Sequence, residues 1–150
     1  MKNLHTKLES YSVYCDELLV QDHLKKLIDS ALERVEQIDC NDLKKISNEI
    51  IILDVREPEE FASGYINAKE VLTIPRGKLE FMALQKIGKK FGLDVELVTY
   101  CLKGPRGVLA ANQLLELGFS NVKNLKGGIL EWLKEGNCIH SYLGEMKLVS

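Results

Sequence analysis

The stretch that decides the fold reads Val95-Glu96-Leu97-Val98-Thr99-Tyr100-Cys101-Leu102-Lys103-Gly104-Pro105-Arg106-Gly107. Its first six residues are mostly apolar and predict a buried strand. Gly104 and Pro105 indicate a tight loop, and the apolar residues that follow indicate a helix. This order places Cys101 where loop N–H groups and the positive end of a helix favour an anion. We therefore expect the thiol to lose its proton more readily than a free cysteine and to act as a nucleophile.

Strand and helix patterns alternate along the rest of the chain. The apolar, β-branched run at 50–53, continued by Val55, predicts a strand buried on both faces. Shorter runs predict further strands at 35–38, 71–74 and 121–125. Helical spacing predicts helices at 24–35, 43–46, 79–87 and 108–115, and after Pro58 and Gly127. This alternation favours an α/β domain with a mostly parallel sheet.

Several residues at the predicted helix ends are typical caps. Asp22 is expected to cap the first helix, and Asn41 or Asp42 the next. Gly118 fits the left-handed position after the helix that follows Cys101, and Phe119 is expected to complete a Schellman arrangement. The boundaries of that helix are therefore predicted at both ends.

Composition narrows the class of protein. A chain of 150 residues suits one domain, and a hydrophobic content of 45% with 28% charged residues is ordinary for a soluble protein. A formal net charge of −2 argues against a nucleic-acid partner, and no apolar run is long enough to span a membrane. Four widely spaced cysteines and no visible signal peptide favour free thiols and a cytoplasmic location.

Several ordered motifs give the sequence a family resemblance. Residues 53–61 with 64–66, residues 74–77, residues 100–106 and residues 118–132 resemble, in that order, the successive signatures of rhodanese domains. The resemblance implies a rhodanese-like five-stranded parallel sheet flanked by helices on both sides, with an extra N-terminal helix. We accordingly predict a helical extension at 1–34 and a rhodanese-like domain at 35–150.

The same resemblance implies sulfurtransferase chemistry, with Cys101 as the catalytic residue that carries a persulfide. The expected donor is a small anion such as thiosulfate, and the expected acceptor is a thiol, cyanide or a protein cysteine. No cofactor and no metal are expected. Pro105 departs from the family pattern and removes one N–H donor from the loop. The residues expected to bind substrate are Leu102, Lys103, Gly104, Arg106 and Gly107.

Charged residues near the motifs allow two interpretations each. Lys103 and Arg106 add positive charge where an anionic donor approaches, but Lys103 could be a solvated side chain and Arg106 could pair with a carboxylate. Asp54 is expected to organise its loop, and Arg56 to pair with a carboxylate such as Glu60. These alternatives stay open at the level of sequence.

The remaining thiols and histidines show no pattern of a second site. Cys15, Cys40 and Cys138 are interpreted as ordinary thiols rather than partners of Cys101. The three histidines have no metal-ligand spacing.

Two other functions compete with sulfur transfer. A cysteine-dependent phosphatase also has a Cys-loop-Arg arrangement, but usually with five residues between the two; here four lie between Cys101 and Arg106, which favours the smaller sulfur atom. A non-enzymatic persulfide carrier or protein-binding module is the second alternative. The apolar stripe of the N-terminal helix also leaves a homodimer open.

Overall fold

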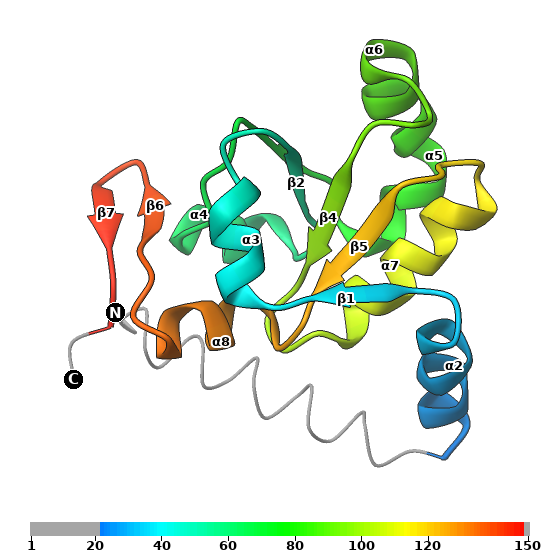
Figure 1. Ribbon diagram of the computed structural model, residues 1–150, viewed down its shortest axis with the longest axis horizontal. Coiled ribbons are helices and arrows are strands. Elements are labelled where there is room, and N and C mark those ends of the chain that lie inside the picture. Colours follow the sequence, from blue (N-terminus) through cyan, green and yellow to red (C-terminus); the bar gives the residue numbers. More distant parts are fainter. Residues whose placement is uncertain (1–21, 149–150) are drawn as a thin grey trace.

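Five parallel strands form one sheet at the centre of the computed structural model, which describes residues 22–148 (Figure 1). The strand order across the sheet is β1-β5-β4-β2-β3, so β4 lies in the middle. The predicted five-stranded parallel sheet is confirmed. The strands are β1 (Glu36–Ile38), β2 (Ile51–Asp54), β3 (Glu70–Thr73), β4 (Leu97–Tyr100) and β5 (Val122–Leu125).

Helices cover both faces of the sheet. Residues of α3 (Cys40–Ile46) and α8 (Gly128–Lys134) join one buried cluster. Residues of α5 (Leu79–Ala83), the π-helical turn η2 (Leu84–Gly88) and α7 (Pro105–Glu116) join the other. The shorter helices are η1 (Arg76–Lys78), α4 (Pro58–Ser63) and α6 (Lys89–Phe91).

The N-terminal helix α2 (Asp22–Leu32) packs against α7 outside the sheet. Its Ile28 and Ala31 are buried, and Arg34 just beyond it forms an ion pair with Glu116 at 2.7 Å. The extra N-terminal helix is thus present. The division of the chain at residue 35 stays a prediction.

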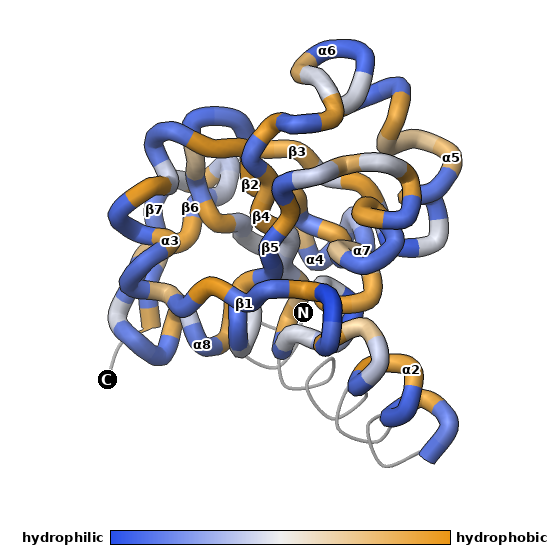
Figure 2. Tube along the Cα trace, turned by 45° about the vertical axis from the view of Figure 1, so that its right-hand side comes forward, coloured by the Kyte–Doolittle hydropathy of each residue, from blue (hydrophilic) through white to orange (hydrophobic). Residues whose placement is uncertain are grey.

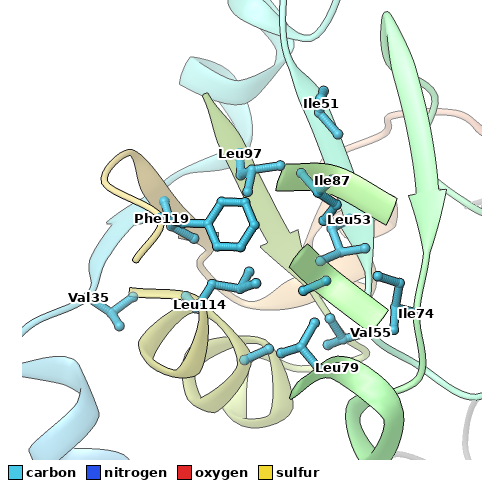
Figure 3. Close-up of a cluster of buried hydrophobic side chains, with 14 of the residues drawn as sticks. Val35, Ile51, Leu53, Val55, Ile74, Leu79, Ile87, Leu97, Leu114 and Phe119 are labelled. Atoms are coloured by element: carbon cyan, nitrogen blue, oxygen red, sulfur yellow. The ribbon is translucent and has the colours of Figure 1, made fainter. Parts of the chain in front are cut away.

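Strand β2 is buried on both faces, as its apolar run predicts. Ile51 and Leu53 point into the cluster beneath α7, which Figure 3 shows, whereas Ile52 belongs to the cluster beneath α8. Figure 2 shows hydrophobic residues around β2 and β4 at the centre of the sheet, whereas β1 and β5 also carry hydrophilic residues. Within residues 22–148, no helix has the length and apolarity needed to cross a membrane.

Helix ends are set by local hydrogen bonds. The Schellman arrangement is confirmed, because Phe119 N–H donates to the Leu114 carbonyl and Gly118 N–H to the Leu115 carbonyl, both at 3.1 Å. The predicted cap of α3 is wrong. Asp39 caps this helix by accepting from Asp42 N–H at 2.8 Å, because the extended backbone that a cap needs occurs at Asp39.

Two further predictions need correction, the cap at Asp22 and the C-terminal segment. Asp22 is the first described residue and already belongs to α2. A C-terminal hairpin of β6 (Ile139–Ser141) and β7 (Gly144–Met146) was not predicted. It joins the domain where Tyr65 and His140 exchange two backbone hydrogen bonds of 2.8 Å.

Candidate active site

Cys101 lies directly after β4, at the carboxyl edge of the sheet and under the start of α7. Its Sγ accepts a hydrogen bond from Gly104 N–H at 3.1 Å. The residue has no exposed surface and packs in the cluster that contains Val55 and Leu79. A donor therefore reaches the sulfur only after local movement of the groups around it.

The loop after Cys101 takes its shape from a glycine followed by a proline. Gly104 has φ of +125°, a backbone conformation that side chains with a Cβ rarely adopt. Pro105 is the first residue of α7, where a helix uses no N–H for its own hydrogen bonds. Val108 N–H then donates to the Gly104 carbonyl at 2.9 Å, so the helix begins immediately above the sulfur.

Helix α8 fixes the outer side of the same loop. Ile129 N–H donates to the Cys101 carbonyl at 3.0 Å, and Leu130 N–H to the Leu102 carbonyl at 3.1 Å. Gly128 permits this approach, because a Cβ there would lie 2.5 Å from the Cys101 carbonyl oxygen and closer still to that of Leu102. These contacts hold the backbone of Cys101 from the side opposite α7.

Arg106 forms a two-point ion pair with Glu60 on α4. Its Nη1 and Nη2 donate to the two carboxylate oxygens at 2.8 and 3.0 Å. Glu60 is 1% exposed and also accepts from Glu57 N–H at 3.1 Å. Of the two interpretations of Arg106, the pairing with a carboxylate is therefore observed, and the ion pair ties the first turn of α7 to α4.

Arg56 forms a buried ion pair with the carboxylate of Asp54. Its Nη2 and Nε donate to Asp54 at 2.7 and 3.0 Å, and Nη2 also reaches the Gly64 carbonyl at 2.7 Å. The predicted pairing of Arg56 with a carboxylate is confirmed, but the partner is Asp54, because Glu60, the example given, binds Arg106. Asp54 does organise this region, because it accepts from Arg56 N–H at 2.9 Å as well.

Tyr100 extends this buried network to the residue before Cys101. Its hydroxyl donates to Asp54 Oδ2 at 2.9 Å and accepts from Ile66 N–H at 3.1 Å. Burial raises the pKa of Tyr100 well above its usual value, so the hydroxyl stays a donor. The ends of β2 and β4 and the segment after α4 are thereby fixed to one another beside the cysteine.

Gly107 lies where α7 crosses the sheet at close range. Its carbonyl accepts from the Thr99 hydroxyl at 2.9 Å, and Asn124 Oδ1 is a second, more distant acceptor for the same hydroxyl at 3.2 Å. A Cβ on Gly107 would overlap that amide oxygen. The glycine thus allows α7 to approach β4 and β5 closely.

The remaining predicted site residues differ in exposure. Leu102 is buried beside α8, whereas Lys103 is only partly buried, at the loop surface. Arg76 forms an ion pair with Glu80. Solvent therefore reaches the loop at Lys103 but not at the Cys101 sulfur.

The other thiols lie away from Cys101 in the described part of the chain. Cys40 belongs to the cluster on the opposite face of the sheet, and Cys138 lies beyond α8; both are free. Cys15 lies outside the described residues. Across residues 22–148, no three His, Cys, Asp or Glu side chains gather in a way that could hold a metal ion.

Sequence reasoning missed Glu60 as the partner of Arg106 and Gly128 as the contact point of α8. Both residues lie inside stretches that carry the family resemblance. Their position in these motifs is the one sequence feature that could have marked them as important. Their partners lie far away in the chain, and no local pattern indicates which residues meet.

Comparisons with known proteins agree with this geometry. The family model described as Rhodanese-like domain matches residues 37–135. A protein named Sulfurtransferase from Allochromatium vinosum is 30% identical over 68% of this chain and 92% of its own length. The human protein named Thiosulfate:glutathione sulfurtransferase is 34% identical over 56% of this chain and 79% of its own length.

A solved structure from Rhodopseudomonas palustris has the same fold. It is described as a protein of unknown function and "Possible Tyrosine Phosphatase"; its TM-score is 0.69 and its identity 27%, over 81% of this chain and 96% of that one. The family match covers the Cys101 loop, α8 and the whole sheet except Glu36. The two curated relatives of this chain named above support sulfurtransferase activity in general terms. The chain belongs to the rhodanese-like domain family.

Proposed function

We propose that this protein transfers a sulfane sulfur from an anionic donor such as thiosulfate to a thiol or cyanide, through a persulfide on Cys101. The observation that carries the proposal is the Gly104 N–H donated to Cys101 Sγ at 3.1 Å, because a donor at that place stabilises a sulfur anion. Relatives named for sulfur transfer, among them one named for thiosulfate and glutathione, support the same substrate class.

In the first step, the Cys101 thiolate attacks the outer sulfur of thiosulfate. A new S–S bond forms to Cys101 while the original S–S bond breaks, and sulfite leaves with that electron pair. The product is a negatively charged persulfide. The start of α7 and the Gly104 N–H favour this charge.

In the second step, the acceptor removes the sulfur. Cyanide or a thiolate attacks the terminal sulfur, the bond to Cys101 breaks, and the Cys101 thiolate is regenerated as thiocyanate or a new persulfide leaves. The enzyme alternates between two covalent states, so ping-pong kinetics are expected.

The loop residues have separate roles in this proposal. Lys103 attracts the anionic donor, and Gly104 supplies the N–H at the sulfur. Leu102 holds the loop through its carbonyl, and Gly107 lets α7 approach the sheet. Arg106 keeps the helix start in place through Glu60, and its charge adds to the positive field of the loop.

The test follows sulfur through both steps. The folded protein is incubated with thiosulfate, and mass spectrometry is expected to find one added sulfur on Cys101 with release of sulfite. Cyanide should then remove it as thiocyanate. Cys101→Ser should lose both signals, whereas Cys138→Ser, which removes a thiol remote from the loop, should keep them.

The two ways in which this experiment can fail lead to different conclusions. Absence of the adduct in folded protein would contradict the proposal. An adduct that cyanide and small thiols cannot remove would favour the alternative, a persulfide carrier for one protein partner.

A phosphatase is the second candidate, favoured by the description of the Rhodopseudomonas palustris neighbour. The site opposes it, because both terminal nitrogens of Arg106 bind Glu60 instead of facing the loop as a phosphate ligand. We expect no hydrolysis of an aryl phosphate. Sustained hydrolysis that disappears in Cys101→Ser would reverse this choice.

A further inference from the structure

A polar pocket of about 520 Å³ lies at the end of α8 remote from the Cys101 loop. The end of α3, the residues after α8 and the β6–β7 hairpin surround it (Figure 1). The first turn of α8 contacts the Cys101 and Leu102 carbonyls, whereas the pocket uses Trp132 and residues beyond Lys134. No residue of 101–107 lines it, so it is separate from the site described above.

The charged side chains that line this pocket are lysines, without a carboxylate among them. Lys44 from α3 and Lys147 after β7 line it together with His140, and no carboxylate does. Glu145 lies 3.7 Å from His140 Nε2 but is not among the lining residues. Within residues 22–148, neither lysine has an ion-pair partner. A pocket with this lining favours an anion.

Asn137 supplies an unused hydrogen-bonding group. It is 8% exposed, and its backbone N–H donates to the Trp132 carbonyl at 3.2 Å. Its side-chain amide makes no hydrogen bond to any described residue, although it lines the pocket. Because this amide faces the pocket and not a protein partner, it is available to donate to a ligand with oxygen acceptors.

Trp132 gives the pocket an apolar wall of fixed orientation. Its Nε1 donates to the Cys138 carbonyl at 2.8 Å, and the side chain is almost wholly buried. Binding sites for small molecules combine an apolar wall with a few convergent polar groups, and their volumes usually lie between about 300 and 1,000 Å³. This pocket has both properties.

We propose that this pocket, defined by Lys44, Trp132, Asn137, His140 and Lys147 and called the distal pocket, binds a small anion bearing carboxylate or phosphate oxygens. The two lysines hold the negative group, and the Asn137 amide donates to it. The rest of the ligand lies against Trp132. This inference does not depend on the sulfur-transfer proposal.

Trp132 is the one tryptophan of the chain, so its fluorescence reports on the distal pocket. The full-length protein is titrated with succinate and with inorganic phosphate, at an ionic strength held constant with sodium chloride. A saturable change with either anion supports the proposal and identifies the preferred group. Choline chloride, a cation without an anionic ligand group, should give no saturable change.

Variants locate the bound anion. Lys44→Gln and Lys147→Gln should each weaken binding about tenfold, as expected for a lost hydrogen bond to a charged group. Lys45→Gln is the matched control: it lies on the same helix, is exposed, contacts Asp42 at 3.7 Å and does not line the pocket. Lys103→Gln should also leave the fluorescence titration unchanged.

Three results would overturn the proposal. The first is no saturable response of folded protein to either anion. The second is equal affinity in Lys44→Gln and Lys45→Gln. The third is loss of the response in Lys103→Gln, since that would locate the anion at the Cys101 loop.

Discussion

At the scale of single residues, the buried hydroxyl of Tyr100 makes two hydrogen bonds, one as donor and one as acceptor. Tyr100→Phe leaves the Ile66 N–H without its acceptor and removes a donor from Asp54. We expect the free energy of unfolding to fall by about 1–3 kcal/mol, measured by urea denaturation.

Tyr142→Phe is the matched control, because that ring is 94% exposed at the hairpin turn. It should change the free energy of unfolding by less than about 0.5 kcal/mol. Equal effects of the two substitutions would show that the buried hydroxyl does not stabilise the fold.

Cys40 makes stability depend on pH in the alkaline range. Burial, and next a hydrogen bond and charge repulsion from Glu135, raise its pKa from 9.0 to about 12. Because the folded pKa is the higher one, the contribution of the neutral thiol is fully present below about pH 9 and is lost as the pH rises toward 12.

The measurement compares unfolding free energies at about pH 8 and about pH 10.5. The wild type should lose more stability over this interval than Cys40→Ala, which has no thiol to ionise. Parallel losses in the two proteins would contradict the assigned pKa shift.

At the scale of elements, the contact of α8 with the Cys101 loop depends on a missing side chain. Gly128→Ala would force the start of α8 away from the Cys101 and Leu102 carbonyls and would add strain at φ of +65°. We expect a loss of about 2–4 kcal/mol in the free energy of unfolding. Thermal and urea unfolding measure it.

Gly77→Ala is the control for this substitution. A Cβ at Gly77 would meet no atom within 4 Å, so a change of less than about 1 kcal/mol is expected. If both glycine variants were equally stable, the close approach of α8 would not limit the packing.

Much of the fold could be predicted because its strongest elements carry their signals locally. Strand β2 and the Schellman end of α7 were readable from apolar runs and a glycine. The β6–β7 hairpin was not, since strands of three residues are too short to show alternation. The cap of α3 was missed because three neighbouring residues, Asp39, Asn41 and Asp42, could all serve.

The candidate site, like the fold, was predictable where it depends on adjacent residues and not where it depends on distant ones. The order of β4, loop and α7 around Cys101 follows from adjacent residues and was predicted correctly in outline. The partner of Arg106 was not predictable, because Glu60 lies 46 positions away and Arg56 is an equally suitable cation closer in sequence. Which carboxylate an arginine meets is decided by tertiary packing, not by spacing.

At the scale of the whole molecule, two buried clusters share one sheet. Trp132 belongs to the cluster beneath α8. Leu114 of α7 and Leu79 of α5 belong to the cluster on the other face of the sheet. Strands buried on both faces couple the clusters, so we expect one cooperative unfolding transition.

Tryptophan fluorescence and far-ultraviolet circular dichroism should therefore give the same urea midpoint. The first probe reports on Trp132 alone, and the second on all helices. Midpoints that differ beyond experimental error would show that the α8 side unfolds separately.

The strand order also affects how the chain folds while it is being synthesised. Strand β1 leaves the ribosome before every other strand of the sheet, yet it pairs with β5, with Glu36 opposite Lys123. The nascent chain therefore carries β1 without its partner until nearly the whole domain has emerged. Such long-range pairing slows folding and prolongs the exposure of an unpaired strand. Protection of β1 against proteases should accordingly be a late event in translation.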